Sequence, residues 1–101
     1  MKKRSSKLAR LENNRFSIIT NNLKECIICK QPKDNLHEVY FGKNRQLSMK
    51  YGCVIPLCYT HHLIIHSNHA LDIVWKIKMQ EAFEKTYPEL DFLKIFGKNY
   101  K

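Results

Sequence analysis

The sequence predicts a single small α+β domain, on the strength of three observations. Two short strand-like segments precede a run of helical segments, the chain has 101 residues, and metal-ligand residues occur in two pairs with two-residue gaps. A core of this size supplies only a modest margin of stability, so a structural metal ion would add directly to the folding free energy. We expect residues 1–15 to form a basic N-terminal segment and residues 16–101 to form the folded domain with its C-terminal helices.

The segment before the first cysteine is expected to contain two short elements. Ser5 or Ser6 can cap a short basic amphipathic helix. Residues 16–20 are rich in β-prone side chains and read as a strand.

Two further strands are predicted in the middle of the chain. Residues 36–41 form the first, ended by the turn residues 42–44. A loop over residues 45–52 leads to a second short strand at 53–57, where Pro56 implies an edge position or a strand end.

Helices are predicted for the rest of the chain. A first helix ends at residues 67–68, which can cap the next one. That long helix stops near Thr86, because the residue before Pro88 avoids the helical region. Residues 90–96 form a last short helix that ends at Gly97. In the long helix the apolar side carries Leu71, Ile73, Val74, Ile77 and Phe83, and the solvated side carries Lys76, Lys78, Glu81, Glu84 and Lys85.

The two ligand pairs are Cys26 with Cys29 and Cys58 with His61. Thiolates and imidazoles at two-residue gaps can grip one ion, and four such ligands close a tetrahedral zinc shell. Disulfides are the alternative, and they are disfavoured because no secretory signal precedes the domain and a reducing cytoplasm is the expected compartment. Cys53 is a spare thiol that could compete for zinc, but it lacks the two-residue spacing.

A second set of histidines follows the second pair. His62 and His66 are four residues apart, so on a helix they project from one face within reach of one cation. His69 falls outside this spacing and is expected to be a packed or surface residue.

The charge favours a polyanionic partner. Eighteen Lys and Arg against nine Asp and Glu give a net charge of +9, spread along the chain. Nucleic acid is the most plausible partner, through release of its counterions. No apolar run is long enough to span a membrane, so no membrane partner is expected.

These motifs together resemble the HNH endonuclease superfamily, and more narrowly the small zinc-knuckle HNH proteins of phages and prophages. The resemblance runs from about Phe16 through Tyr100. The residues that carry it are Cys26, Cys29, residues 36–42, Asn44, Arg45, Ser48, residues 51–52, residues 57–58, His61, His62 and His66.

The resemblance implies a zinc-stabilised ββα-metal fold and metal-dependent hydrolysis of DNA phosphodiesters in a phage or prophage DNA-processing step. His37 would join His62 and His66 around one catalytic Mg²⁺, Mn²⁺ or similar ion. Either Glu38 or His37 would activate water. Candidate DNA contacts are Lys43, Asn44, Arg45 and Lys50, with Lys2, Lys3, Arg4, Lys7 and Arg10 adding non-specific affinity.

The chain also departs from the superfamily pattern. Glu38 stands where many members have a general-base histidine, and Cys53 stands where they have the middle asparagine, for which Asn44 could substitute. A catalytically inactive zinc-finger DNA-binding or regulatory protein is therefore the alternative. A protein-interaction module that uses the zinc knuckle alone is disfavoured by the charge.

Overall fold

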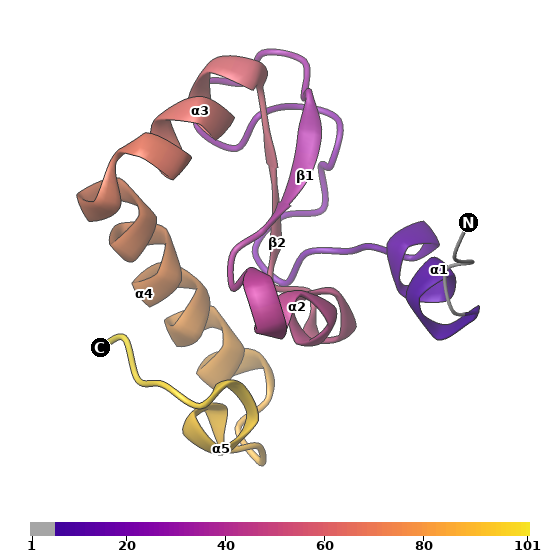
Figure 1. Cartoon of the computed structure of the whole chain (residues 1–101), viewed down its shortest axis with the longest axis vertical. Helices are drawn as coiled ribbons and strands as arrows, with labels where there is room; N and C mark the ends of the chain where they lie inside the picture. Colours follow the sequence, from indigo (N-terminus) through magenta and orange to yellow (C-terminus); the bar gives the residue numbers. More distant parts are fainter. Residues whose placement is uncertain (1–5) are drawn as a thin grey trace.

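The computed structural model describes residues 6–101, and these form a mixed α+β fold, as predicted (Figure 1). Ser5 lies outside the described residues, and the first helix begins at Ser6. The elements are α1 (Ser6–Asn13), β1 (Asn35–Glu38), the 3₁₀ helix η1 (Gly42–Asn44), α2 (Arg45–Tyr51), β2 (Val54–Leu57), α3 (Tyr59–Ser67), α4 (His69–Thr86) and α5 (Phe92–Phe96).

The two strands pair antiparallel, with Leu36 opposite Pro56 and His37 opposite Ile55. Because the sheet has two strands, both are edges, and Pro56 is tolerated in β2 without the loss of a central ladder bond. The strands are shorter than predicted. After β1 ends, Val39 and Tyr40 are both buried in the core, so the chain leaves the alternating pattern of a strand with one solvated face.

The prediction of a loop over residues 45–52 is wrong, because most of this segment forms the helix α2. Gly52 ends this helix in the left-handed conformation, with φ of 77°, and its N–H donates to the carbonyl of Ser48. The buried Ser48 hydroxyl donates to the carbonyl of Tyr40 at 2.6 Å, which joins α2 to the end of β1. A glycine in this position is typical of a helix C-terminus as well as of a turn.

The strand predicted at residues 16–20 is also wrong. This segment is irregular and crosses the end of α2, where the N–H of Ile18 donates to the carbonyl of Gly52 at 3.0 Å. A single bond to a helix end leaves the segment without a strand partner, so its β-prone side chains serve packing instead.

The boundaries of the helices in the second half follow the prediction closely. The predicted apolar side of α4 is partly wrong, because Val74 is 43% exposed while Asp72, Met79 and Gln80 are buried. The Asn68 side chain accepts from the N–H of Leu71 at 3.1 Å and starts α4, which ends at Thr86. The fifth helix begins at Phe92 rather than Leu90, because the Asp91 side chain caps it. No described helix has the length and apolar composition needed to cross a membrane.

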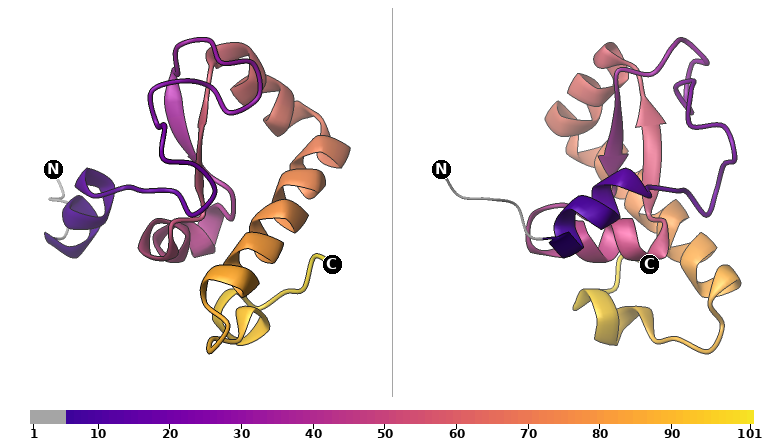
Figure 2. Two further views of the ribbon diagram at one scale, coloured as in Figure 1. Left: turned by 180° about the vertical axis from the view of Figure 1, so that it is seen from behind. Right: turned by 90° about the vertical axis from the view of Figure 1, so that its right-hand side faces the viewer.

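Two views agree on the arrangement around the β1–β2 hairpin. The helices α3 and α4 run along one side of it, and α1 lies on the opposite side next to α2 (Figures 1 and 2). An aromatic cluster joins α4 and α5 to the segment that follows β1. The ring of Tyr40 lies 4.7 Å from that of Phe96 and 5.3 Å from that of Phe92, and its hydroxyl donates to the carbonyl of Lys76 at 2.6 Å. This cluster fixes α4 and α5 against the end of β1.

We predict that Gly52→Ala destabilises the protein more than Gly97→Ala. Both glycines have positive φ, so alanine costs about 1–2 kcal/mol of backbone strain at either position. At Gly52 the added Cβ would lie 2.5 Å from Phe16 Cε2 and 2.9 Å from Ile18 Cγ2, whereas at Gly97 it meets nothing within 4 Å. Ile18 cannot withdraw easily because its backbone bonds to Gly52.

The overpacking should lower the free energy of unfolding of the Gly52→Ala variant by roughly a further 1–3 kcal/mol. Thermal unfolding with zinc in excess measures the difference between the two variants. Equal melting temperatures would show that the contact between residues 16–20 and α2 does not constrain this position.

Candidate metal centres

A tight turn brings the first pair of cysteines together. The N–H of Cys26 donates to the carbonyl of Gln31 at 2.7 Å, and the N–H of Lys30 donates to the carbonyl of Cys26 at 3.0 Å. Lys30 itself has φ of 67°, the left-handed conformation that closes the turn. The N–H of Ile27 then donates to the carbonyl of Pro56 at 2.9 Å, which places the turn beside β2.

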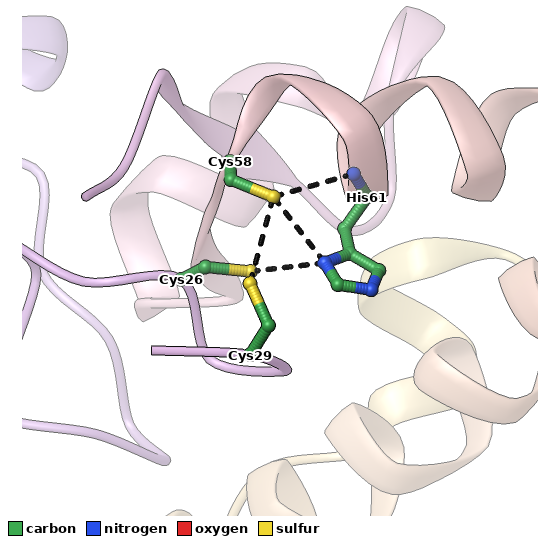
Figure 3. A group of neighbouring side chains, drawn as sticks. All are labelled: Cys26, Cys29, Cys58 and His61. Carbon is green, nitrogen blue, oxygen red and sulfur yellow. Dashed lines mark hydrogen bonds between the residues drawn. The ribbon is translucent and has the colours of Figure 1, made fainter. Parts of the chain in front are cut away.

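The second pair comes from the junction of β2 and α3 (Figure 3). Cys58 caps α3 and accepts from the N–H of His61 at 3.5 Å, while its Sγ lies 3.3 Å from His61 Nδ1 and 3.7 Å from Cys29 Sγ. Cys26 Sγ lies 3.6 Å from the same imidazole nitrogen. Neighbouring sulfur ligands of a tetrahedral zinc ion lie about 3.8 Å apart, so the predicted Cys₃His group has the spacing that zinc requires.

The thiol chemistry also suits a metal ligand. Cys26 is fully buried, and burial alone would raise its pKa. Backbone N–H groups, that of Cys58 first among them, more than offset this and lower the pKa of Cys26 to about 6. The thiolate, the form that binds metal, is therefore favoured at neutral pH.

Cys53 lies apart from this group. It is fully buried, and burial raises the pKa of its thiol to about 12. All four cysteines are unbonded, and the 3.7 Å between Cys29 Sγ and Cys58 Sγ is far beyond a disulfide bond. The structure thus brings together the four predicted ligands and leaves out the spare thiol.

The three predicted histidines form a second group. His37 comes from β1 and His62 and His66 from α3, and one nitrogen from each lies within 4.8 Å of the others. The Nε2 atoms of His62 and His66 are 3.0 Å apart. Nitrogens bound to one ion at about 2.1 Å lie about 3.0–3.4 Å apart, so this pair has the spacing of two ligands of one ion. His69 is absent from both groups.

This second group is open on one side. His37 is buried, His62 is half-buried and His66 is exposed. Burial, helped by the neighbouring His66 and His62, lowers the pKa of His37 to about 4. The imidazole is therefore neutral at pH 7, which is the form that can bind a metal ion.

Glu38 is engaged in ion pairs rather than free. Its Oε1 accepts from Arg15 at 2.8 Å and from Arg45 at 3.3 Å. Arg45 also pairs with Glu12 of α1 at 2.6 Å. This network ties α1 and the following segment to β1 and α2.

The predicted nucleic-acid contacts are divided between two places. Asn44 donates to the carbonyl of Phe96 at 3.0 Å, so it holds η1 to α5 instead of joining the histidines. Lys43, Arg45, Lys50 and Lys7 line a pocket between α1 and α2. Arg10 is exposed on α1, and Lys2, Lys3 and Arg4 lie outside the described residues.

Three residues near the histidines were missed or misplaced by the sequence analysis. Lys76, predicted to be solvated, has a side chain only 13% exposed and pairs with the buried Asp72 at 2.9 Å. Its Nζ lies 4.5 Å from the ring centre of Phe41, which is 45% exposed and within 6.0 Å of the ring of His37. The spacing of Asp72 and Lys76 by four residues was the available signal for their pairing.

Comparison of the chain with protein-family models, with curated proteins and with solved structures found no match.

We predict that Cys58→Ser abolishes zinc binding and lowers the melting temperature, whereas Cys53→Ala leaves one zinc per chain. The first change removes one of the four proposed ligands. The second removes the buried thiol of Cys53, which belongs to neither metal-ligand group. Elemental analysis and thermal unfolding of both variants are the measurements. Retention of zinc by Cys58→Ser, or its loss from Cys53→Ala, would contradict the assignment of ligands.

Proposed function

We propose that this protein is a metal-dependent DNA endonuclease of the zinc-stabilised ββα-metal, or HNH, type. The observation that carries the proposal is the open histidine group, in which one strand and the following helix present three imidazoles to one point beside a separate Cys₃His group. A structural zinc site needs no such second group. A metal-dependent hydrolase does need such a group, with positions left open for water and substrate.

The charge of the chain supports DNA as the substrate. The net charge of +9 favours a polyanion, and residues of α1 and α2 line a cationic pocket. The helix α1 lies on the other side of the hairpin from α4 (Figure 1). A divalent ion held by the histidines would neutralise charge that develops on the scissile phosphate and on the leaving oxygen. On the strength of the resemblance alone, we propose phage or prophage DNA processing in the bacterial cytoplasm as the setting of this activity.

His62 and His66 are proposed as the principal ligands. They lie on one face of α3, and the side chain of His62 is directly next to that of His66. His37, buried on β1, either completes the ligand set or accepts the proton of the attacking water. Since it is buried and held among the other two rings, its position is well defined for either role.

Glu38 is the weaker candidate for the general base. Two guanidinium groups, those of Arg15 and Arg45, donate to its Oε1, so this oxygen is already engaged in ion pairs. We therefore propose that Glu38 holds β1 to α2 and to the segment after α1, and that its effect on the reaction is indirect.

One observation favours the alternative function, a DNA-binding zinc module without catalysis. The position at which the resemblance expects a base-orienting asparagine holds Cys53, which is fully buried, and Asn44 is bonded to Phe96 instead. Among the described residues, no amide side chain donates to His37, His62 or His66. The nicking experiment below decides between the two functions.

His62→Ala and His66→Ala are each predicted to reduce nicking of supercoiled plasmid in Mg²⁺ or Mn²⁺ by about 100-fold or more, because each removes a ligand of the ion. Zinc content and melting temperature should stay close to those of the wild type. His69→Ala is the matched control and should keep full activity, since His69 belongs to neither group. Absence of nicking by the wild-type protein with both metals supplied would leave the binding module as the function.

Two variants distinguish the possible roles of these residues: His37→Ala tests whether His37 is a metal ligand or the general base, and Glu38→Gln tests whether Glu38 is the base or a structural residue. If His37 is a ligand, His37→Ala weakens Mn²⁺ binding in calorimetry; if it is the base, Mn²⁺ binding persists and nicking is lost. Glu38→Gln should lower the melting temperature by several degrees through loss of its ion pairs, yet reduce the rate less than about tenfold. A loss of about 100-fold with an unchanged melting temperature would make Glu38 the base.

A further inference from the structure

A pocket of about 540 Å³ lies between α1 and α2, outside both metal-ligand groups. Its volume is within the range of about 300–1,000 Å³ that is typical of small-molecule sites. Two kinds of side chain line it. The cations are Lys7, Lys43, Lys50 and Arg45, the apolar residues are Leu8, Leu11 and Leu47, and Gly42 and Gln46 complete the lining.

The three lysines are exposed, and within residues 6–101 none of them has a carboxylate partner. The charge of Arg45, which also lines the pocket, is already balanced by Glu12 and Glu38. The pocket therefore holds an excess of positive charge around partly buried leucines. Cations around an apolar surface fit a ligand with an anionic group and an apolar ring.

Two short connections link the pocket to the histidine group. Arg45, on the pocket wall, donates to Glu38, whose neighbour in β1 is His37. Gly42, also on the wall, follows Phe41, whose exposed ring lies within 6.0 Å of His37 and 5.8 Å of His66. Residues 41 and 42 thus join the pocket wall to an exposed aromatic ring beside the histidines.

We propose that this pocket binds one unpaired nucleotide of a DNA strand, with the base against the leucines and its phosphates on the lysines, and that the protein therefore prefers single-stranded or frayed DNA. A paired base keeps its faces stacked in the duplex, so only an unpaired one can lie against an apolar pocket wall. The role of the bound strand as substrate rests on the proposed function, whereas its binding does not.

An acidic peptide is the other polyanion with apolar parts. The pocket favours a nucleotide because its volume is about 540 Å³, because the residue next to Gly42 on its wall carries an exposed aromatic ring, and because positive charge is spread along the chain. A peptide helix would need an elongated apolar groove instead.

The binding test uses the zinc-loaded His62→Ala protein without added Mg²⁺ or Mn²⁺, so that no cleavage interferes. Fluorescence anisotropy compares an oligothymidylate with a duplex of equal length. In this background the pocket variant Lys7→Ala/Lys43→Ala/Lys50→Ala is matched in charge by the control Lys33→Ala/Lys85→Ala/Lys94→Ala. The pocket variant should weaken single-strand affinity at least about tenfold more than the control.

The apolar wall has its own test. Leu11→Gln, which keeps the net charge, should remove the preference for the single strand and leave duplex affinity nearly unchanged. If this variant does not fold by circular dichroism, an NMR titration of the unmodified protein decides. Thymidine 5′-monophosphate should shift the amide signals of Gly42 and Gln46 more than inorganic phosphate does at the same concentration.

Three results would overturn the inference. Equal losses in the pocket and control variants would show that the pocket adds nothing beyond net charge. Equal shifts with thymidine 5′-monophosphate and inorganic phosphate would show that no base is bound. Displacement of oligothymidylate by an oligoglutamate of the same charge at equal concentration would assign the pocket to an acidic peptide. None of these results depends on nicking, so a failed nuclease assay leaves the inference standing.

Discussion

The first turn of α3 is the constraint on which both candidate metal centres depend. Cys58 caps this helix, His61 follows in the first turn, and His62 is the next residue. Consecutive residues point about 100° apart around a helix axis, so His61 faces the cysteines while His62 faces His37. Any rotation of α3 that improved one group would displace the other. The Cys₃His group therefore determines the orientation of the histidines.

The β1–β2 hairpin positions the members of the Cys₃His group and of the histidine group that do not come from α3. Backbone hydrogen bonds from Ile27 and Asp34 to β2 place the cysteine turn beside the start of α3. His37, opposite Ile55, is held in register by β1–β2 pairing. Across the hairpin, the ion pairs of Glu38 and Arg45 seat α1 next to α2 and so form the wall of the cationic pocket. Contacts of the hairpin thus position the Cys₃His group, the histidine group and the cationic pocket relative to one another.

The features that could be predicted were those set by spacing along the chain. The two-residue gaps predict the members of the Cys₃His group, the four-residue gap predicts that His62 and His66 lie together, and Asn68 and Gly97 mark helix boundaries. Features set by contacts between distant segments were missed. The helix α2 is short and is held to the end of β1 by the bond from Ser48 to Tyr40. Lys76 is half-buried, with its Nζ over the rings of Phe41 and Tyr100, which come from other parts of the chain. The sequence predicts Glu38 as a candidate base, but its pairing with Arg15 and Arg45 follows from packing that spacing does not reveal.

The most direct test of two distinct metal centres on one helix turn is anomalous diffraction from crystals grown with zinc and soaked in Mn²⁺, recorded at the absorption edges of both metals. We expect a zinc peak among Sγ of Cys26, Cys29 and Cys58 and Nδ1 of His61, and a separate manganese peak among the imidazoles of His37, His62 and His66. A single peak, or a metal bound to Cys53, would contradict this account.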